Sequence, residues 1–292
     1  MTNAYIVSVA RTAGGRRGGR LKDWHPADLA ALALDAIIDR TGIDPGQVED
    51  VIMGCVSQVG EQAFSVGRGA VLSSKLPESV PATTIDRQCG SSQQAIHFAA
   101  ATVMSRQMDV VIAAGVESMT RVPMGLANTL AAQNGFGTPD SPGMARRYPG
   151  IAFSQFSGAE AIALKHDLSK DMLDAFAFDS HRKAIAAANA GYFDAEIVPV
   201  PVVDAEGVET LHLRDEGIRF DASLEGIANV RLIQEGGRLT AASASQICDG
   251  ASAVLIVNDA GLKRLGLTPL ARIHEMTVIG EDPVIKIGRA HV

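Results

Sequence analysis

The chain has 292 residues, 47% of them hydrophobic, which is enough apolar side chain to bury the core of one large or two medium domains. A formal net charge of −7 and an aromatic content of only 4% argue against the basic grooves and stacking surfaces of nucleic-acid-binding proteins. The three cysteines form no CxxC pair, which disfavours a disulfide framework or a zinc site and fits reduced thiols in a cytoplasm: Cys55, Cys89 and Cys248.

The first 119 residues have the pattern of a soluble α/β protein. Their first arginines follow a short apolar run, the reverse of a secretory signal, and no stretch of the chain reaches the roughly 20 apolar residues of a membrane helix. Continuous or β-branched apolar runs alternate with segments of helical spacing, which predicts a layered α/β fold with a largely parallel sheet. The predicted strands are 5–10, 51–54, 82–85 and 110–118, and the predicted helices are 25–40 and a segment beginning near Cys89.

Between residues 120 and 249 the sequence no longer shows the regular alternation of predicted strands and helices. Residues 123–157 are rich in Gly, Pro, Asn and Ser without a clear period, and they predict an irregular excursion from the sheet. Helices are predicted at 157–168 and at 169–191, the second with Ser169 as its N-cap and Gly191 as its stop. A short β-like run follows at 196–203. We interpret this segment as an inserted loop or cap domain.

The last part of the chain returns to the sheet pattern and then stops. Residues 251–259 read as a buried strand, and 270–280 begin what resembles another. The final IGRAHV is also encoded by one reading frame of a common sequencing adapter, so we expect a truncated assembly product; a native stop codon directly after Val292 would contradict this. The expected divisions are 1–119 and 250–270 for an N-terminal domain, 120–249 for the insertion, 271–286 for the start of a truncated C-terminal domain, and 287–292 for a non-native tail.

Cys89 is the leading candidate for a catalytic nucleophile. It lies in TTIDRQCGSSQQAI, where a short β-branched run is followed by a polar turn and an alanine-rich helical stretch. Free N–H groups and the macrodipole at a helix N-terminus stabilise a thiolate, the form that attacks a carbonyl. The alternative is a small buried hydrophobic residue, which is the ordinary role of an intracellular cysteine and our interpretation of Cys55 and Cys248.

A cysteine nucleophile usually needs a base, and the sequence offers none nearby. His97 lies eight residues further on, about 12 Å along a helix axis, so it cannot serve Cys89 directly. The glycine-rich AGGRRGGR at 13–20 lacks the phosphate-loop spacings and reads as a flexible turn, and no carboxylate pair or HExxH set suggests a metal. His291 lies in the final IGRAHV and carries no weight. The remaining histidines sit in patterns typical of surface positions: His25, His166, His181, His212 and His274.

Five blocks of this sequence occur in the order seen in thiolases, and the chain through about Pro283 resembles that family. The blocks are ARTAGGRRGGRL, GCVSQVGEQAFSVGR, TTIDRQCGSSQQAI, AAGVESMTRVPMG and LTAASASQICDGASAVLI. The resemblance implies a layered α-β-α fold whose N-terminal half carries an inserted loop domain and whose C-terminal half is mostly absent here. The family's NEAF block, its activating GHP histidine and its CxGG cysteine would lie beyond this chain, which would explain the missing base.

The resemblance also implies roles for single residues. Cys89 matches the nucleophile that takes the acyl group as a thioester, with its own backbone N–H contributing to an oxyanion hole. Ser245 matches a serine that hydrogen-bonds the pantetheine arm of CoA, and Arg219 matches an arginine at the nucleotide end of CoA. Without the family resemblance, we would interpret Ser245 as a turn residue and Arg219 as a solvated surface charge.

Some positions depart from the family pattern. Asp86 stands where many members have Asn, and an unpaired carboxylate beside a thiol disfavours the thiolate, so we expect Arg87 to pair with it. Ile233 stands where some relatives carry Phe by the adenine. The segment from Ser154 resembles degradative thiolases more than biosynthetic ones, which have a His-Met pair where this chain has Ser154 and Gln155.

The resemblance implies an acyl-CoA thiolase, an acetyl-CoA C-acyltransferase that cleaves 3-ketoacyl-CoA through an acyl-cysteine in fatty-acid or steroid side-chain degradation. CoA would be a substrate with no cofactor or metal, and dimers or tetramers are expected, with 123–157 at a subunit contact. The alternatives are an acetyltransferase forming acetoacetyl-CoA, a non-catalytic CoA or lipid-thioester binding protein, and a papain-like hydrolase, which has no family support. We expect residues 1–292 alone to be inactive and poorly soluble, because an unpaired half-fold exposes apolar surface.

Overall fold

The computed structural model describes residues 2–204, 206–280 and 282–285, and the chain divides into two compact units. The first unit consists of Met1–Ala127, Asp194–Glu216 and Ile247–Thr277. The second consists of Asn128–Phe193, Gly217–Gln246 and the described residues from 278 on.

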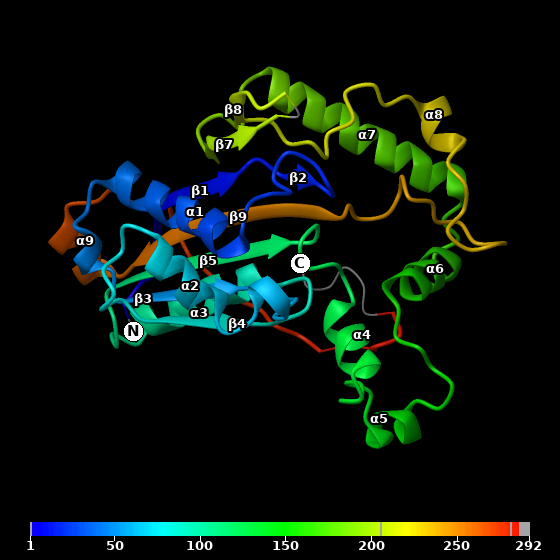
Figure 1. The fold of residues 1–292 in the computed structure, drawn as a ribbon, viewed down its shortest axis with the longest axis horizontal. Helices are drawn as coiled ribbons and strands as arrows, with labels where there is room; N and C mark the ends of the chain where they lie inside the picture. Colours follow the sequence, from blue (N-terminus) through cyan, green and yellow to red (C-terminus); the bar gives the residue numbers. More distant parts are fainter. Residues whose placement is uncertain (1, 205, 281, 286–292) are drawn as a thin grey trace. The chain divides into compact units, whose positions relative to one another are not determined.

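A mixed sheet is the centre of the first unit (Figure 1). Its order is β10-β1-β9-β5-β3-β4, with the short β2 paired to β9 and β6 paired to β1. The strands are β1 (Tyr5–Thr12), β2 (Gly15–Arg16), β3 (Asp50–Gly54), β4 (Ala82–Ile85), β5 (Val110–Ser118), β6 (Ile197–Val198), β9 (Cys248–Val257) and β10 (Ala271–Arg272).

The predicted sheet is parallel only in part. Strands β3, β4 and β5 pair in parallel, as their alternation with helices predicts, whereas β9 pairs antiparallel with both β5 and β1. The reason is that β9 follows a long irregular segment rather than a crossover helix, so it is free to enter from the opposite end. The ends of β3, β4 and β5 and the beginning of β9 therefore meet at one edge of the sheet.

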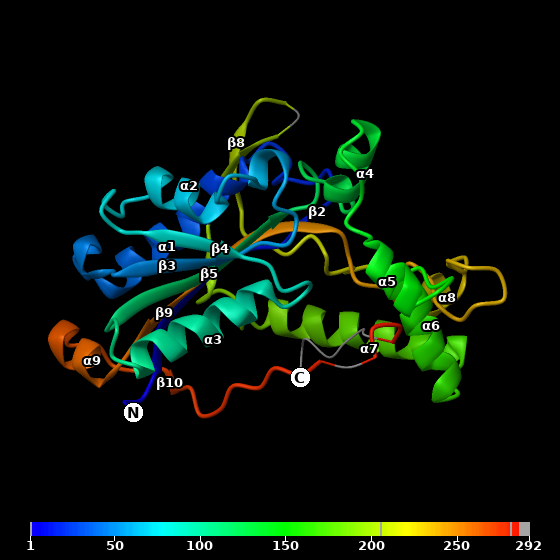
Figure 2. The ribbon, with the colours of Figure 1, turned by 90° about the horizontal axis from the view of Figure 1, so that it is seen from below.

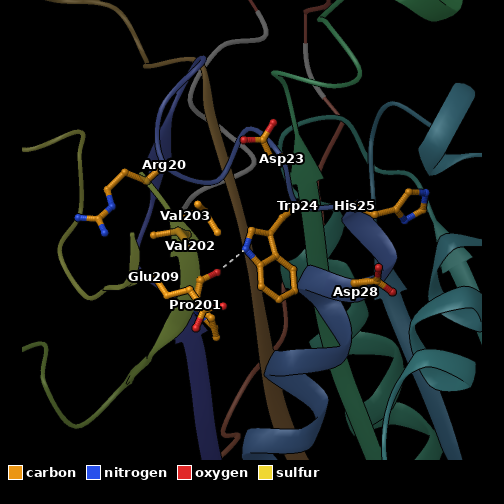
Figure 3. Close-up of a pocket in the computed structure, with 9 residues that line it drawn as sticks. All are labelled: Arg20, Asp23, Trp24, His25, Asp28, Pro201, Val202, Val203 and Glu209. Carbon is orange, nitrogen blue, oxygen red and sulfur yellow. Dashed lines mark hydrogen bonds between the residues drawn. The ribbon is translucent and has the colours of Figure 1, made fainter. Parts of the chain in front are cut away.

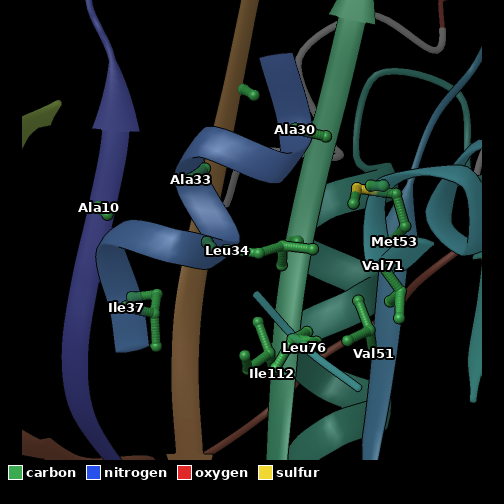
Figure 4. Packing of buried hydrophobic residues seen from close by; sticks show 14 of the residues in the cluster. Ala10, Ala30, Ala33, Leu34, Ile37, Val51, Met53, Val71, Leu76 and Ile112 are labelled. Atoms are coloured by element: carbon green, nitrogen blue, oxygen red, sulfur yellow. The ribbon is translucent and has the colours of Figure 1, made fainter. Parts of the chain in front are cut away.

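Helices cover both faces of this sheet. The helices of the first unit are α1 (Pro26–Thr41), α2 (Val66–Ser73), α3 (Ser91–Met104) and α9 (Asp259–Leu265), with 3₁₀ turns at Pro45–Gln47 and Gly60–Gln62. Apolar side chains of α1 and α2 pack on strands β3 and β5 in the larger core cluster (Figure 4). Helix α3 lies along the sheet (Figure 2), and its small residues Ala95, Ala99 and Ala100 pack with Ile52 and Val111 in a separate cluster. The two clusters make the sheet a layer buried from both sides.

The segments outside this sheet are mainly helical, and none of the helices in the described residues is long and apolar enough to span a membrane. The segment predicted to be irregular contains two helices. Helix α5 begins where the Ser141 hydroxyl accepts a hydrogen bond from the Met144 amide (3.1 Å) and Pro142 occupies the first turn, a start signal that outweighs the surrounding glycines. The elements are α4 (Leu126–Gln133), α5 (Pro142–Arg147), α6 (Gln155–Lys165), α7 (Lys170–Asn189), α8 (Leu224–Ala228) and the hairpin β7 (Val200–Val203) and β8 (Glu209–His212).

The observed division differs from the expected domains at several boundaries. Residues 120–127 and 247–249, expected in the insertion, lie in the first unit, and strand pairing accounts for two further differences. Residues 194–216 belong to the first unit rather than to an insertion, because Ile197 and Val198 pair with Arg11 and Thr12 of β1. Residues 271–277 also stay with the first unit, since Ala271 pairs with Ile6 of β1. The expected tail, 287–292, lies outside the described residues.

Asp259 ties the N-terminus of the chain to the first turn of α9. Its carboxylate accepts hydrogen bonds from the Thr2 hydroxyl, the Asn3 amide (3.1 Å) and the Tyr5 hydroxyl (2.9 Å). These bonds, that of Thr2 first, lower the pKa of Asp259 from 3.8 to about 2. The ionised carboxylate is thus favoured in the folded state.

We expect Asp259→Asn to change how stability depends on pH. A folded pKa below the unfolded one contributes stability above about pH 4, and this contribution is lost as the pH falls towards the folded value. Urea unfolding at a series of pH values should therefore show wild type more stable than the variant near neutrality, with the gap closing towards acid. Asp140→Asn, on an exposed loop, is the control and should follow the wild-type profile. A gap that persists unchanged in acid would contradict the prediction.

Candidate active site

Cys89 lies in a tight turn between β4 and α3, at the sheet edge where the parallel strands end. Helix α3 begins at Ser91, with Gly90 as its N-cap, so Cys89 precedes the helix that was predicted to begin near it. Its backbone has a φ of 63°, in the left-handed region that residues with a Cβ rarely adopt. Strain of this kind persists only where surrounding contacts impose it, and it is concentrated at functional sites.

Ser91 closes the Cys89 turn. Its hydroxyl oxygen accepts a hydrogen bond from the Arg87 amide at 3.1 Å and donates to the Arg87 carbonyl at 3.2 Å. The Gly90 amide donates to the same carbonyl at 2.7 Å. Ser91 is 6% exposed, so these bonds are shielded from water. They hold the three residues between Arg87 and Ser91 in a conformation that turns Cys89 outward.

Two glycines allow the first turn of α3 to rest directly on the sheet. A methyl group at Gly54, the last residue of β3, would lie 2.4 Å from the backbone of Ser91 and Ser92. A methyl group at Gly115 would lie 2.6 Å from the Cβ of Ser92. Gly54 and Gly115 are direct partners in the pairing of β3 with β5. This glycine pair was not identified from sequence, although each glycine closes or interrupts a β-like run, which is typical of a close backbone approach.

The electrostatics of the turn suit a nucleophile. No side chain caps the N-terminus of α3, so its first N–H groups remain available to an anion. The Cys89 thiol is exposed, and among the described residues no atom accepts a hydrogen bond from the Cys89 amide. A thiol and a free amide at the same residue can respectively attack a carbonyl and stabilise the oxyanion that forms.

Asp86 has a different partner from the one expected. Its carboxylate accepts two hydrogen bonds from the Gln88 side-chain amide, at 2.7 and 3.0 Å, and no ion pair with Arg87 occurs among the described residues. The turn directs the side chains of Asp86 and Gln88 towards each other, whereas Arg87 between them is exposed to solvent. Asp86 therefore pairs with Gln88. Asp86 is itself exposed, so water screens its charge from Cys89.

The other two cysteines lie at the same sheet edge but in environments that oppose a thiolate. Burial, followed by the charge of Glu117, raises the pKa of the Cys55 thiol to about 12. Cys248 is exposed as a residue, but displacement of water by the atoms around its sulfur, followed by the charges of Asp249 and Glu117, raises the pKa of its thiol. Glu117 is held here because it accepts bonds from the Val56 amide (2.8 Å) and the side chain of Gln62 (2.8 Å). Exposed Cys89 is thus the better nucleophile.

The glycine-rich loop near the N-terminus is fixed rather than flexible. Asp215 accepts bonds from the Gly14 amide (2.6 Å) and the Arg11 guanidinium (2.7 Å), and Glu216 accepts one from the Arg20 amide (3.0 Å). Burial opposes the charge of Asp215, but its bonds from Arg11 and Gly14 keep its pKa below the usual value. Amides that already face carboxylates cannot cradle a phosphate, so the structure gives no support to a nucleotide loop at 13–20.

His212 is buried, although its pattern suggested the surface. It is 1% exposed, and its Nε2 lies 3.1 Å from the Ala13 carbonyl oxygen. Burial lowers the pKa of His212, which favours the neutral ring. The sequence pattern misled because β8 turns alternate side chains inward, and the pairing of His212 with Val200 becomes apparent only in the hairpin.

Arg219 and Ser245 both lie in the second unit, on segments that one hydrogen bond joins. The Gln246 side-chain amide donates to the Gly217 carbonyl at 2.7 Å, and a methyl group on Gly217 would lie 2.3 Å from Gln246 Oε1. The Arg219 amide donates to His181 Nδ1 on α7 at 3.3 Å. The side chains of Arg219 and Ser245 are exposed and can reach a ligand. Gln246 was not singled out from sequence, since nothing local marks its partner.

A surface cavity of about 360 Å³ lies elsewhere in the first unit (Figure 3). Its walls come from residues 20–28 and from the β7–β8 hairpin. The indole N–H of Trp24 donates to the Pro201 carbonyl at 2.8 Å, and the Arg20 guanidinium donates to the Thr210 hydroxyl at 2.5 Å. None of the lining residues belongs to the Cys89 turn, and the polar groups of Trp24 and Arg20 are engaged by the hairpin. We therefore place the candidate site at Cys89 and not in this cavity.

Comparisons with known proteins agree with the five sequence blocks. A family model described as "Thiolase, N-terminal domain" matches residues 4–260. A steroid 3-ketoacyl-CoA thiolase of Mycobacterium tuberculosis is 46% identical over 98% of this chain and 70% of its own length. A 3-ketoacyl-CoA thiolase of Yersinia pestis is 40% identical over 98% of this chain and 72% of its own. The crystal structure of an acetyl-CoA acetyltransferase of Bacillus anthracis has a TM-score of 0.85 at 31% identity, covering 98% of this chain and 73% of that one.

Proposed function

The chain belongs to the thiolase family, and on that premise we propose that Cys89 takes the acyl group of a 3-ketoacyl-CoA as a thioester. The protein then acts as an acyl-CoA thiolase of fatty-acid or steroid side-chain degradation. One observation carries the proposal: Cys89 is an exposed thiol in a left-handed turn at an uncapped helix N-terminus. That position offers both a nucleophile and groups that stabilise negative charge.

Thiolysis divides into two steps through the acylated cysteine. In the first, the Cys89 thiolate attacks the C3 carbonyl, the new S–C bond forms, and the bond between C2 and C3 breaks. Acetyl-CoA leaves as its enolate and is protonated. In the second, the thiolate of free CoA attacks the acyl-cysteine, Cys89 leaves as the thiolate, and an acyl-CoA shortened by two carbons is released. Both steps place negative charge on the former carbonyl oxygen, where the Cys89 amide can donate a hydrogen bond.

CoA is the shared part of both substrates, and the second unit supplies candidates to hold it. The family resemblance assigns Ser245 to the pantetheine arm and Arg219 to the nucleotide end. Two features support these roles: both side chains are exposed, and the Gln246–Gly217 bond keeps their segments together. A guanidinium suits the phosphate groups of CoA, because it donates several hydrogen bonds and carries a permanent charge.

The preferred length of the substrate's acyl chain distinguishes the proposed activity from an acetyltransferase that forms acetoacetyl-CoA. The protein expressed from its complete coding sequence should convert 3-ketoacyl-CoA and CoA into acetyl-CoA and a shortened acyl-CoA, followed by mass spectrometry. We expect long or steroid-derived 3-ketoacyl chains to be cleaved more efficiently than acetoacetyl-CoA. Preference for acetoacetyl-CoA would instead favour an acetyltransferase function, the activity for which the similar Bacillus anthracis protein is named. Binding of CoA without turnover of any of these substrates would favour a non-catalytic binding protein.

We further propose that the protein works in the cytoplasm and associates with itself as a dimer or tetramer. Three unpaired cysteines support a reducing compartment. Exposed apolar side chains at 123–157, among them Met124, Phe136 and Ile151, support a subunit contact at that segment. Light scattering of the purified protein will give its mass in solution.

A further inference from the structure

The segment that leads to Ser245 has little regular structure of its own. After α8, it contains one isolated bridge between Leu232 and Thr240, within the described residues. A stretch with so few backbone bonds depends on side chains from other elements to hold its conformation. In the second unit, helix α6 provides them.

Glu160 of α6 binds the backbone of this segment directly. Its carboxylate accepts hydrogen bonds from the Arg238 amide, at 2.8 and 2.9 Å, and from the Leu239 amide at 2.8 Å. A methyl group on Gly237 would lie 2.5 Å from Glu160 Oε1, so a side chain at this position would displace the Glu160 carboxylate. Gly236 has a φ of 72°, which turns the chain into position. Bonds to an ionised acceptor are about twice as strong as neutral ones.

Arg238 makes the reciprocal contact. Its guanidinium donates to the carbonyl oxygens of Ala163 (3.1 Å) and Leu168 (2.7 Å), at the end of α6 and just beyond it. A side chain of α6 thus binds the backbone of the loop, and a side chain of the loop binds the backbone at the end of α6. The two contacts together fix both the position and the rotation of residues 237–239.

Further hydrogen bonds connect residues 237–239 to Ser245 and Arg219, the residues assigned to CoA. Thr240 is fully buried, and the Ser243 hydroxyl accepts a bond from the Thr240 amide (3.0 Å) while the Ser243 amide donates to the Thr240 carbonyl (3.2 Å). This compact turn leaves only Ala244 before Ser245. Gln246 then bonds to Gly217, two residues from Arg219. A displacement at Glu160 is therefore transmitted to Ser245 over a short, ordered path.

We propose that Glu160 and Arg238 are positioning residues for CoA: they set where Ser245 meets the pantetheine arm without touching CoA themselves. This inference rests on the proposed function, because it takes the CoA role of Ser245 as given. It predicts that loss of the Glu160 carboxylate weakens use of CoA while leaving the Cys89 thiol as reactive as before.

The test compares acylation with alkylation in the protein expressed from its complete coding sequence. Acetyl-CoA acylates Cys89, and intact mass gives the rate at increasing acetyl-CoA. Iodoacetamide alkylates the same thiol without using a CoA site. For Glu160→Ala we expect the half-saturating acetyl-CoA concentration to rise roughly tenfold, equivalent to about 1.4 kcal/mol, with the alkylation rate unchanged. Glu160→Gln keeps one acceptor oxygen and should give a smaller rise, on the order of threefold.

Glu235→Ala is the matched control, since it removes an exposed carboxylate from the same loop and should leave both rates at the wild-type level. If Glu160→Ala does not fold, the Glu160→Gln result decides. An unchanged half-saturating concentration, or an alkylation rate that falls in parallel with acylation, overturns the positioning role. Failure of wild-type Cys89 to be acylated at all would instead count against the proposed function, so the two failures are distinguishable.

Discussion

Cys89→Ala is expected to abolish the acyl-enzyme completely. Incubation of the wild-type protein, expressed from its complete coding sequence, with acetyl-CoA should add the mass of one acetyl group, and the variant should add none. The physical reason is that no other thiol at this sheet edge is both exposed and free of opposing charge, since Cys55 is buried with a pKa of about 12. Because the proposed mechanism passes through this covalent intermediate, thiolysis should fall to background in the same variant.

Cys248→Ala provides the control for this result, because it removes the other exposed thiol. We expect it to keep the acetyl label and most of the activity, since the atoms packed around its sulfur displace water from it and, with the carboxylates of Asp249 and Glu117, raise the pKa of Cys248. Peptide mapping of the labelled wild-type protein should place the acetyl group on Cys89. A label that survives Cys89→Ala would show that another residue is the nucleophile.

Gly54→Ala is expected to destabilise the protein by about 3 kcal/mol, at the upper end of the cost of overpacking. The added methyl group would lie 2.4 Å from the backbone of Ser91 and Ser92, and backbone atoms cannot move aside as a flexible side chain can. The first turn of α3 must then lift from the sheet, which also displaces Cys89. Urea unfolding measures the stability change, and acetylation of Cys89 measures the effect on the turn.

Gly250→Ala is the matched control for Gly54→Ala. Gly250 lies in β9 of the same sheet, but a methyl group there would meet only the Thr12 hydroxyl oxygen at 3.5 Å, an ordinary contact. We expect this variant to change stability by less than about 1 kcal/mol and to be acetylated normally. Equal stability and acetylation in the two variants would show that α3 does not need the glycine beneath it.

The regular elements of the first unit could be predicted because their signals are local. The continuous apolar run of β5 and the spaced apolar residues of α1 specify a buried strand and a helix without reference to the rest of the chain. Ser169 likewise caps α7 as expected, its hydroxyl accepting a bond from the Met172 amide at 3.2 Å. The β-like run at 196–203 was visible in the sequence, but the assignment of residues 194–216 to the first unit could not be predicted, because nothing local shows that the two residues of β6 pair with β1.

In the candidate site, too, the features with local signals could be predicted and the contacts between distant residues could not. The sequence by itself determined the family, the candidate nucleophile and the alternation of strands and helices, because these depend on residue types at short, regular spacings. Tertiary structure decided the left-handed backbone of Cys89, the pairing of Asp86 with Gln88, the burial of His212 and the contact of Glu160 with residues 237–239. Most of these depend on atoms brought together from distant positions, and the turn at Cys89 is held by α3 resting on two strands. Such contacts are set by packing and have no period that a sequence pattern can reveal.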